Sequence, residues 1–232
     1  MTIHGFQKLT LLDFPNKTAC TVFTGGCNLR CPFCHNSDLV LRAAATPVIP
    51  EEEIFSFLEK RQHTLEGVCI TGGEPMLRKD LPAFCEAIKQ RGFAVKIDTN
   101  GFYPAQLKYI VNSGLCDYVA MDIKNTWEKY PETTGIPHLD VSAARESARF
   151  LIQSSLPHEF RTTVCRPFHT TEDLITIAAD LGPDQPYFLQ AFKNSGALLG
   201  NGIEGFSPME MKEILASVRR ISPLVGLRGV DI

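Results

Sequence analysis

Residues 67–92 read GVCITGGEPMLRKDLPAFCEAIKQRG and contain one strand followed by one helix. The run GVCITGG (67–73) is short, apolar and rich in β-branched residues, as is typical of a buried strand. Beyond the turn, apolar residues recur at helical spacing, which predicts a helix that starts at about Asp80 and ends at Gly92. A strand, a turn and a helix in this order form the building block of parallel α/β folds.

The same unit recurs along the chain. Five other segments have strand character, and they are TACTVFTGG (18–26), FAVKIDTNG (93–101), YVAMDIK (118–124), HEFRTTVC (158–165) and PYFLQAFK (186–193). Helical patterns occur in EEEIFSFLEKRQ (51–62), PAQLKYIVNSG (104–114), LDVSAARESARFLIQSS (139–155), TTEDLITIAADLG (170–182) and SPMEMKEILASVRRI (207–221). A last apolar piece, LVGLRGVDI (224–232), follows them. We therefore expect a single domain over residues 1–232 with a parallel sheet, either doubly wound or an incomplete (β/α)6 barrel.

Unusual polar motifs stand where the predicted strands end. They are TGGC (24–27), TGGEP (71–75), DTNG (98–101), MDIK (121–124) and QAFK (190–193). In (β/α) barrels the chemistry gathers at the carboxyl ends of the strands. Turn formation explains one or two such motifs more easily than five, so we expect a functional site at this edge.

The composition excludes several classes of protein. Of the 232 residues, 44% are hydrophobic and 21% are charged, which is ordinary for a soluble globular protein. The net charge of -3, without a dense run of Lys or Arg, does not suggest a nucleic-acid partner. No apolar run reaches the roughly 18 residues that span a bilayer, and MTIHGFQKLTLLDFPNK (1–17) does not resemble a secretory signal. We expect a cytoplasmic protein with no membrane partner.

Three of the eight cysteines, Cys27, Cys31 and Cys34, have the spacing C-x3-C-x2-C. Structural zinc needs a fourth ligand, and no second C-x2-C pair is present to supply it. Catalytic zinc with three protein ligands and a redox pair of Cys31 and Cys34 remain alternatives. The spacing favours an iron–sulfur cluster with one iron left open for a small molecule. The remaining cysteines are scattered, and we expect buried apolar side chains at Cys20, Cys69, Cys85, Cys116 and Cys165.

The cysteine motif, with Phe33 just before its last cysteine, resembles the signature of radical S-adenosylmethionine (SAM) enzymes. The resemblance implies an incomplete (β/α)6 TIM-like barrel with a [4Fe-4S] cluster on the three cysteines. It also implies that SAM chelates the open iron and is cleaved by one electron to a 5′-deoxyadenosyl radical.

TGGEP (71–75) resembles the GGE motif of that family, which lines the SAM amino group. The resemblance assigns Gly72, Gly73 and Glu74 to the cofactor site. Glycines suit this place because their bare backbone can approach a polar ligand closely.

Three further motifs narrow the resemblance to the enzymes that activate glycyl-radical enzymes: CPFCHN (31–36), DTNG and MDIK. The stretch LTLLDFPNKTACTVFTGGCNLRCPFCHN (9–36) is similar in particular to activating proteins of anaerobic ribonucleoside-triphosphate reductase. The resemblance implies a protein substrate, from which a backbone glycine loses a hydrogen atom. It also implies a flavodoxin- or ferredoxin-type electron donor.

Carried over position by position, the resemblance implies that Lys124 pairs with the SAM carboxylate. An ion pair with Asp122, which shares its face of an extended strand, is the alternative. The residues that match oxygen ligands of a monovalent cation beside SAM are Asp98, Thr99 and Asp122. His35 lies where the family places the adenine, and Lys193 stands where it has a histidine near SAM.

Two other functions compete with an activase. A small-molecule radical SAM enzyme of similar length, such as 7-carboxy-7-deazaguanine synthase, would share the barrel and the cofactors. A zinc-bound interaction module without catalysis would share only the cysteines, and it would lack the absorption of a cluster near roughly 400 nm.

Overall fold

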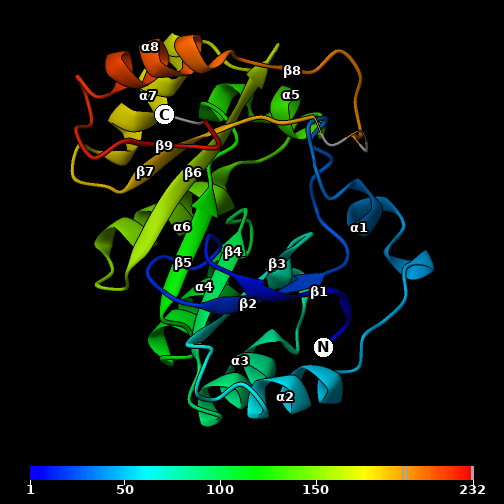
Figure 1. Cartoon of the computed structure of the whole chain (residues 1–232). Coiled ribbons are helices and arrows are strands. Elements are labelled where there is room, and N and C mark those ends of the chain that lie inside the picture. The colour runs from blue at the N-terminus through cyan, green and yellow to red at the C-terminus, as the bar shows by residue number, and fades with distance from the viewer. Residues whose placement is uncertain (195, 197, 231–232) are drawn as a thin grey trace.

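A sheet of mostly parallel strands runs through the centre of the molecule (Figure 1). The computed structural model describes residues 1–194, 196 and 198–230. In this part of the chain the strand order is β1-β2-β3-β4-β5-β6-β7-β9, and β8 pairs with β6. The strands are β1 (Ile3–Thr10), β2 (Ala19–Thr24), β3 (Gly67–Gly72), β4 (Ala94–Thr99), β5 (Tyr118–Asp122), β6 (His158–Arg166), β7 (Tyr187–Ala191), β8 (Glu204–Gly205) and β9 (Gly226–Arg228).

Strands β2 to β7 follow one another across the sheet in chain order, and each neighbouring pair is parallel. The outer strand β9 adds to β7 in parallel, whereas β1 adds to β2 in antiparallel orientation. Among the described residues β1 and β9 do not pair with each other, so the sheet remains open. The predicted α/β fold with an incomplete barrel is confirmed.

Helices connect the strands and cover the sheet (Figure 1). The α-helices are α1 (Ser37–Leu41), α2 (Glu51–Glu59), α3 (Leu81–Gln90), α4 (Pro104–Asn112), α5 (Tyr130–Thr134), α6 (Ser142–Gln153), α7 (Thr171–Leu181) and α8 (Pro208–Val218). Short 3-10 turns are η1 (Ala43–Ala45), η2 (Pro75–Leu77) and η3 (Trp127–Lys129). We find no helix within the described ranges with the length and apolar character needed to cross a membrane.

The core lies between the sheet and these helices. Val68 and Ile70 of β3 and Val95 of β4 are fully buried, and they belong to one apolar cluster with Leu81 and Phe84 of α3. The residues of these strands that face the helices are apolar, which is why the sequence shows the strands clearly. The packing fixes the strands, so their carboxyl ends form one rigid edge.

The structure differs from the sequence prediction at both ends of the sheet and in one loop. Strand β1 was not predicted, because residues 7–9 are exposed and its apolar pattern does not alternate. Helix α1 and η1 lie in SDLVLRAAATPVI (37–49), for which the sequence analysis gave neither a helix nor a strand. The C-terminal apolar piece contains β9, and its residues 231–232 lie outside the described part of the chain.

Candidate cofactor site

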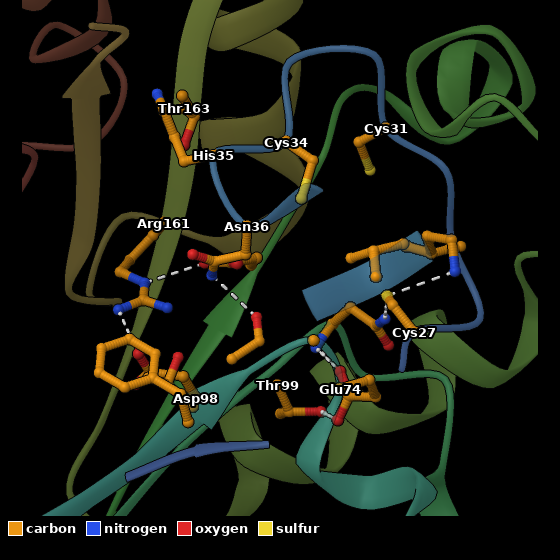
Figure 2. Close-up of a pocket in the computed structure, with 18 of the residues that line it drawn as sticks. Cys27, Cys31, Cys34, His35, Asn36, Glu74, Asp98, Thr99, Arg161 and Thr163 are labelled. Atoms are coloured by element: carbon orange, nitrogen blue, oxygen red, sulfur yellow. Dashed lines mark hydrogen bonds and ion pairs between the residues drawn. The ribbon is translucent and has the colours of Figure 1, made fainter. Parts of the chain in front are cut away.

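A cavity of about 450 Å³ opens at the carboxyl ends of the parallel strands (Figure 2). Its walls come from the ends of β3, β4, β5 and β7, from the middle of β6, and from the cysteine loop, residues 25–36, between β2 and α1. The lining is completed by Gln7, Asp13, Phe23 and Val40. All five polar strand-end motifs contribute residues to these walls. Every residue that the sequence analysis assigned to the cofactor site lines the cavity, except Lys193.

Lys193 follows β7 but is exposed and is absent from the lining of the cavity. The backbone of Lys193 contacts a residue of the cavity instead: His35 donates a hydrogen bond from Nε2 to the Lys193 carbonyl oxygen at 2.6 Å. The His35 ring also stacks on Phe192 with 5.2 Å between the ring centroids. The sequence analysis therefore named the right segment, but the Lys193 side chain does not join the other predicted residues.

The cysteine loop is shaped by backbone hydrogen bonds to distant parts of the chain. These bonds are Gly26 N–H to Leu39 O (2.7 Å), Glu74 N–H to Gly26 O (2.8 Å), Arg30 N–H to Thr134 O (2.8 Å) and Gly200 N–H to Pro32 O (2.9 Å). Phe33 is buried and packs against Phe168 with 5.7 Å between the ring centroids. The loop is thus held from several sides, with its three cysteines facing the cavity (Figure 2).

The turn after β3 touches the start of the cysteine loop so closely that only glycine fits. A Cβ at Gly73 would overlap the carbonyl group of Gly26. A Cβ at Gly72 would overlap the backbone of Thr24, and its φ of +117° is itself unfavourable for other residues. Contact between two segments of this chain therefore requires glycine here, and the approach of a ligand to the same backbone stays a prediction.

The three thiols are free, and their surroundings suit a metal-bound sulfur. Burial raises the pKa of Cys27 to about 11 and that of Cys31 to about 12, and it also raises the pKa of Cys34. Without a metal these groups are therefore neutral, and metal binding would release their protons. Leu29 N–H and the Asn100 amide approach Cys27 Sγ at 3.4 and 3.7 Å, as donors do around cluster sulfurs.

The donor set fits a cluster better than a single ion. Among the described residues, no group of three or more His, Cys, Asp or Glu side chains could hold one metal ion. A cubane makes a different demand, because each cysteine sulfur binds its own iron atom. Three thiols around one cavity, Cys31 buried and Cys27 and Cys34 half-buried, meet that demand.

Glu74 lines the cavity, yet its carboxylate is bound to the protein. It accepts hydrogen bonds from Met76 N–H (2.9 Å), Thr99 Oγ1 (2.8 Å) and Asn100 N–H (2.7 Å). Burial raises the pKa of this side chain to about 7 despite these three donors. Glu74 therefore ties the end of β3 to the end of β4 and positions both strand ends around the cavity.

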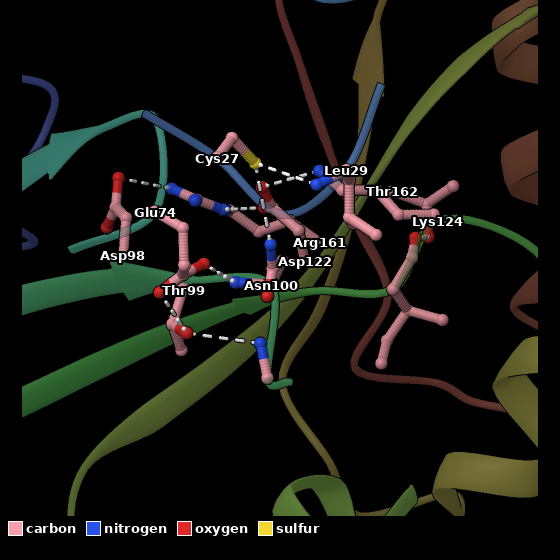
Figure 3. A network of polar contacts seen from close by, with 12 residues as sticks. Cys27, Leu29, Glu74, Asp98, Thr99, Asn100, Asp122, Lys124, Arg161 and Thr162 are labelled. Carbon is pink, nitrogen blue, oxygen red and sulfur yellow. Dashed lines mark hydrogen bonds and ion pairs between the residues drawn. The ribbon is translucent and has the colours of Figure 1, made fainter. Parts of the chain in front are cut away.

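Five charged side chains form a network beside the cavity, and Figure 3 shows Asp98, Asp122, Lys124 and Arg161 of this network. Arg161 donates from Nε to Asp122 at 2.9 Å and from Nη1 to Asp98 at 3.2 Å. Lys124 pairs with the second oxygen of Asp122 at 3.0 Å, and Lys96 pairs with Asp98. The ion pair considered as the alternative role of Lys124 is thus present. Two carboxylates face three cations, which leaves one positive charge in excess.

The network shifts the pKa values of its acids downward. Burial alone would raise the pKa of Asp122, but the charges of Arg161 and Lys124 hold it at about 2. Burial is likewise outweighed at Asp98, where Arg161 and Lys96 keep the pKa below its usual range. Both acids are therefore ionised at neutral pH.

The sequence analysis missed Arg161 and Lys96. A signal was available for both, since a charged residue inside an apolar strand needs a partner when it is buried. Alternation along a strand also places Lys96 and Asp98 on one face, as it does Asp122 and Lys124. Only the second of these pairs was noticed.

Comparison with known proteins identifies the family to which this fold and site belong. Residues 21–181 match the family model described as the radical SAM superfamily. The chain belongs to the radical SAM superfamily. This superfamily uses a [4Fe-4S] cluster and S-adenosylmethionine, so both predicted cofactors are confirmed. Which side chains of this chain hold them remains a prediction.

Similar proteins include activating enzymes. A Methanocaldococcus jannaschii protein named "Putative glycyl-radical enzyme activating enzyme MJ1227" is 37% identical over 56% of this chain and 53% of its own length. The pyruvate formate-lyase-activating enzyme of Clostridium pasteurianum is 31% identical over 53% of this chain and 52% of its own length. A shorter match, to 7-carboxy-7-deazaguanine synthase of Hyperthermus butylicus, is 40% identical over 34% of this chain and 33% of that protein. The chain spans about half the length of the curated relatives that head this group.

The fold of this radical SAM chain also recurs in solved structures. Streptococcus suis SuiB bound to precursor peptide SuiA superposes with a TM-score of 0.72 at 14% identity. The match covers 90% of this chain and 48% of SuiB. At this identity the likeness concerns the fold alone.

Proposed function

We propose that this radical SAM chain activates a glycyl-radical enzyme by abstracting a hydrogen atom from one of its backbone glycines. The observation that carries this proposal is the meeting of three cysteine thiols and the Lys124 ammonium in one cavity. The names of the relatives described above support the activase reading. The similarity of residues 9–36 supports anaerobic ribonucleoside-triphosphate reductase as the partner.

Cys27, Cys31 and Cys34 would hold three irons of the [4Fe-4S] cluster. When bound, the cluster and SAM supply the one-electron cleavage that generates the group able to take a hydrogen atom. The chain contributes position and charge: Lys124 offers an ammonium for the SAM carboxylate, and Glu74 holds two strand ends in place. The open side of the sheet would admit the glycine segment of the partner, and an electron donor of the flavodoxin or ferredoxin type would reduce the cluster.

The first experiment tests the cysteines. Cys31→Ala should lose bound iron and the absorption near roughly 400 nm after anaerobic reconstitution, because one iron loses its ligand. Cys165→Ala is the matched control, since Cys165 is buried in the same small apolar cluster but lies outside the motif. Equal iron content in both variants would contradict the proposed ligand set, and tightly bound zinc in place of iron would favour a zinc module.

The second experiment tests the reaction. Reduced, cluster-loaded protein should convert SAM to 5′-deoxyadenosine, and mixing with anaerobic ribonucleotide reductase should give a glycyl-radical doublet in electron paramagnetic resonance. Cleavage of SAM without the doublet would contradict the reductase as the partner, but it would still support the radical chemistry. Lack of 5′-deoxyadenosine would remove the proposed activity.

The match to 7-carboxy-7-deazaguanine synthase favours a second candidate function. That enzyme acts on a small molecule, whereas an activase acts on a protein. Formation of a deazaguanine product by the cluster-loaded chain, detected by mass spectrometry, would select this alternative.

A further inference from the structure

The side chains that resemble ligands of a monovalent cation already have partners within the chain. Asp98 Oδ1 is paired with Lys96 and Asp98 Oδ2 with Arg161. The Thr99 hydroxyl donates to Glu74 at 2.8 Å and accepts from Gly101 N–H at 3.1 Å. A metal cation at this place would have to displace a charged group of the protein.

The same is true of Asp122, whose two oxygens pair with Arg161 at 2.9 Å and Lys124 at 3.0 Å. Across the network, each of the four carboxylate oxygens has a cationic partner. The donor set therefore does not fit an additional cation, because the negative charge that would attract it is already balanced.

Lys96 is the unusual member of this network. It lies in the middle of β4, it is only 1% exposed, and its ammonium reaches the carboxylate of the next residue on the same face of the strand. Its other polar neighbour is Cys69 Sγ at 3.8 Å. A lysine with so little access to water is rare unless it serves as the partner of a charge. Here it sits beside Asp98, where the metal cation was expected.

We propose that the Lys96 ammonium replaces the monovalent cation, so that this chain binds SAM without added potassium or sodium. The inference rests on the proposed function, because it concerns the same SAM site. The tethered ammonium of Lys96 and a potassium ion both provide one positive charge beside the Asp98 carboxylate. The tethered group has the advantage that no ion must be captured from solution, so the wall of the cavity is organised before SAM arrives.

The test compares SAM affinity in potassium chloride and in choline chloride at equal ionic strength, measured by calorimetry on the cluster-loaded protein. Wild-type affinity should be equal in the two salts within about twofold. In choline, Lys96→Met should bind SAM at least about tenfold more weakly, and potassium should restore most of the loss. Lys89→Met is the matched control: Lys89 pairs with Asp117 at 2.6 Å, away from the cavity, and its loss should change neither value.

A measurement without cofactors separates this inference from the proposed function. Potassium, relative to choline, should raise the melting temperature of metal-free Lys96→Met and leave that of the wild type unchanged. If Lys96→Met does not fold, the wild-type comparison still decides. A wild-type affinity that rises more than about fivefold with potassium would overturn the inference, as would a Lys96→Met protein that potassium does not affect. Absence of SAM binding in both salts would overturn the proposed function, and the metal-free comparison would then decide the role of Lys96.

Discussion

At the scale of single residues, Arg161 has the most consequential contacts in the cavity. Its guanidinium bridges Asp98 and Asp122, which come from two different strands, and its side chain is only 12% exposed. Removal of one partner from a buried charge network leaves the remaining charges uncompensated. The residue therefore holds two strand ends together through charge as well as packing.

We expect Arg161→Gln to lower the free energy of unfolding of the metal-free protein by about 3 kcal/mol. Arg166→Gln is the matched control, because Arg166 lies on the same strand but forms an exposed pair with Glu210 at 2.8 Å. Its loss should cost less than about 1 kcal/mol. Denaturant unfolding of both variants measures the difference. Equal losses of unfolding free energy would mean that the buried network stabilises the fold no more than the exposed ion pair does.

Asp122 gives a prediction on acid stability. Its pKa is about 2 in the folded chain against 3.8 as the ordinary value, so the folded state favours the ionised form. The resulting stabilisation is complete above pH 4 and is lost as the pH falls towards 2. The wild type should therefore lose up to about 2 kcal/mol relative to Asp122→Asn between pH 4 and pH 2. An energy difference that stays constant over this range, in unfolding titrations at each pH, would refute the depressed pKa.

Single residues also show which parts of the site can be predicted from the sequence and which cannot. The cysteines were found because their spacing is a local pattern, and Asp122 with Lys124 because the two residues are only two positions apart, at and just after the end of β5. Arg161 was missed because its partners are on β4 and β5, and only the assembled sheet brings them together. The assignment of Glu74 to the cofactor site stays a prediction, and nothing local in the sequence reveals the three protein donors that surround its carboxylate.

At the scale of elements, the turn after β3 and the cysteine loop form one unit. Glu74 N–H donates to the Gly26 carbonyl at 2.8 Å, and Gly73 lies against the same peptide group. The turn therefore sets the position of the first cysteine. We therefore expect a substitution in the turn or in the cysteine loop to alter metal binding.

Gly73→Ala should reduce iron bound per chain after reconstitution, because its methyl group must push the cysteine loop away from β3. Gly92→Ala is the control. Gly92 has a φ of +84° but no atom near its added methyl group, so the cost is limited to backbone strain of about 1 kcal/mol. Iron content and melting temperature distinguish the two effects. Full iron binding by Gly73→Ala would show that the loop is less constrained than its contacts imply.

The elements themselves were largely predictable, for a physical reason. Buried parallel strands and amphipathic helices carry their patterns within a few residues. Strand β1 carries no such pattern, because it is an antiparallel edge strand with an exposed stretch at residues 7–9. The two-residue strand β8 exists only through its pairing with β6, which no local sequence pattern encodes.

At the scale of the whole molecule, SAM should stabilise the fold as it binds. With SAM at 100 times its dissociation constant, the free energy of unfolding of cluster-loaded protein should rise by about 2.7 kcal/mol. The same concentration should give a clearly smaller rise for Lys124→Ala, because the carboxylate of SAM loses its cation. Comparison of each protein with and without SAM cancels the intrinsic cost of the substitution. If SAM raised the free energy of unfolding equally in both proteins, Lys124 would not contribute to SAM binding.

The backbone partners of the cysteine loop have a consequence for the order of assembly. Three of these partners, Glu74, Thr134 and Gly200, lie far along the chain from the residues of the loop that they bind. Contacts of this kind form late in folding, because each requires the closure of a long stretch of chain. In small zinc modules metal uptake and folding are one event, but here we expect the chain to fold first. Refolding should therefore proceed at the same rate with or without iron and sulfide, and the cluster would be built into a receptor that already has its final shape.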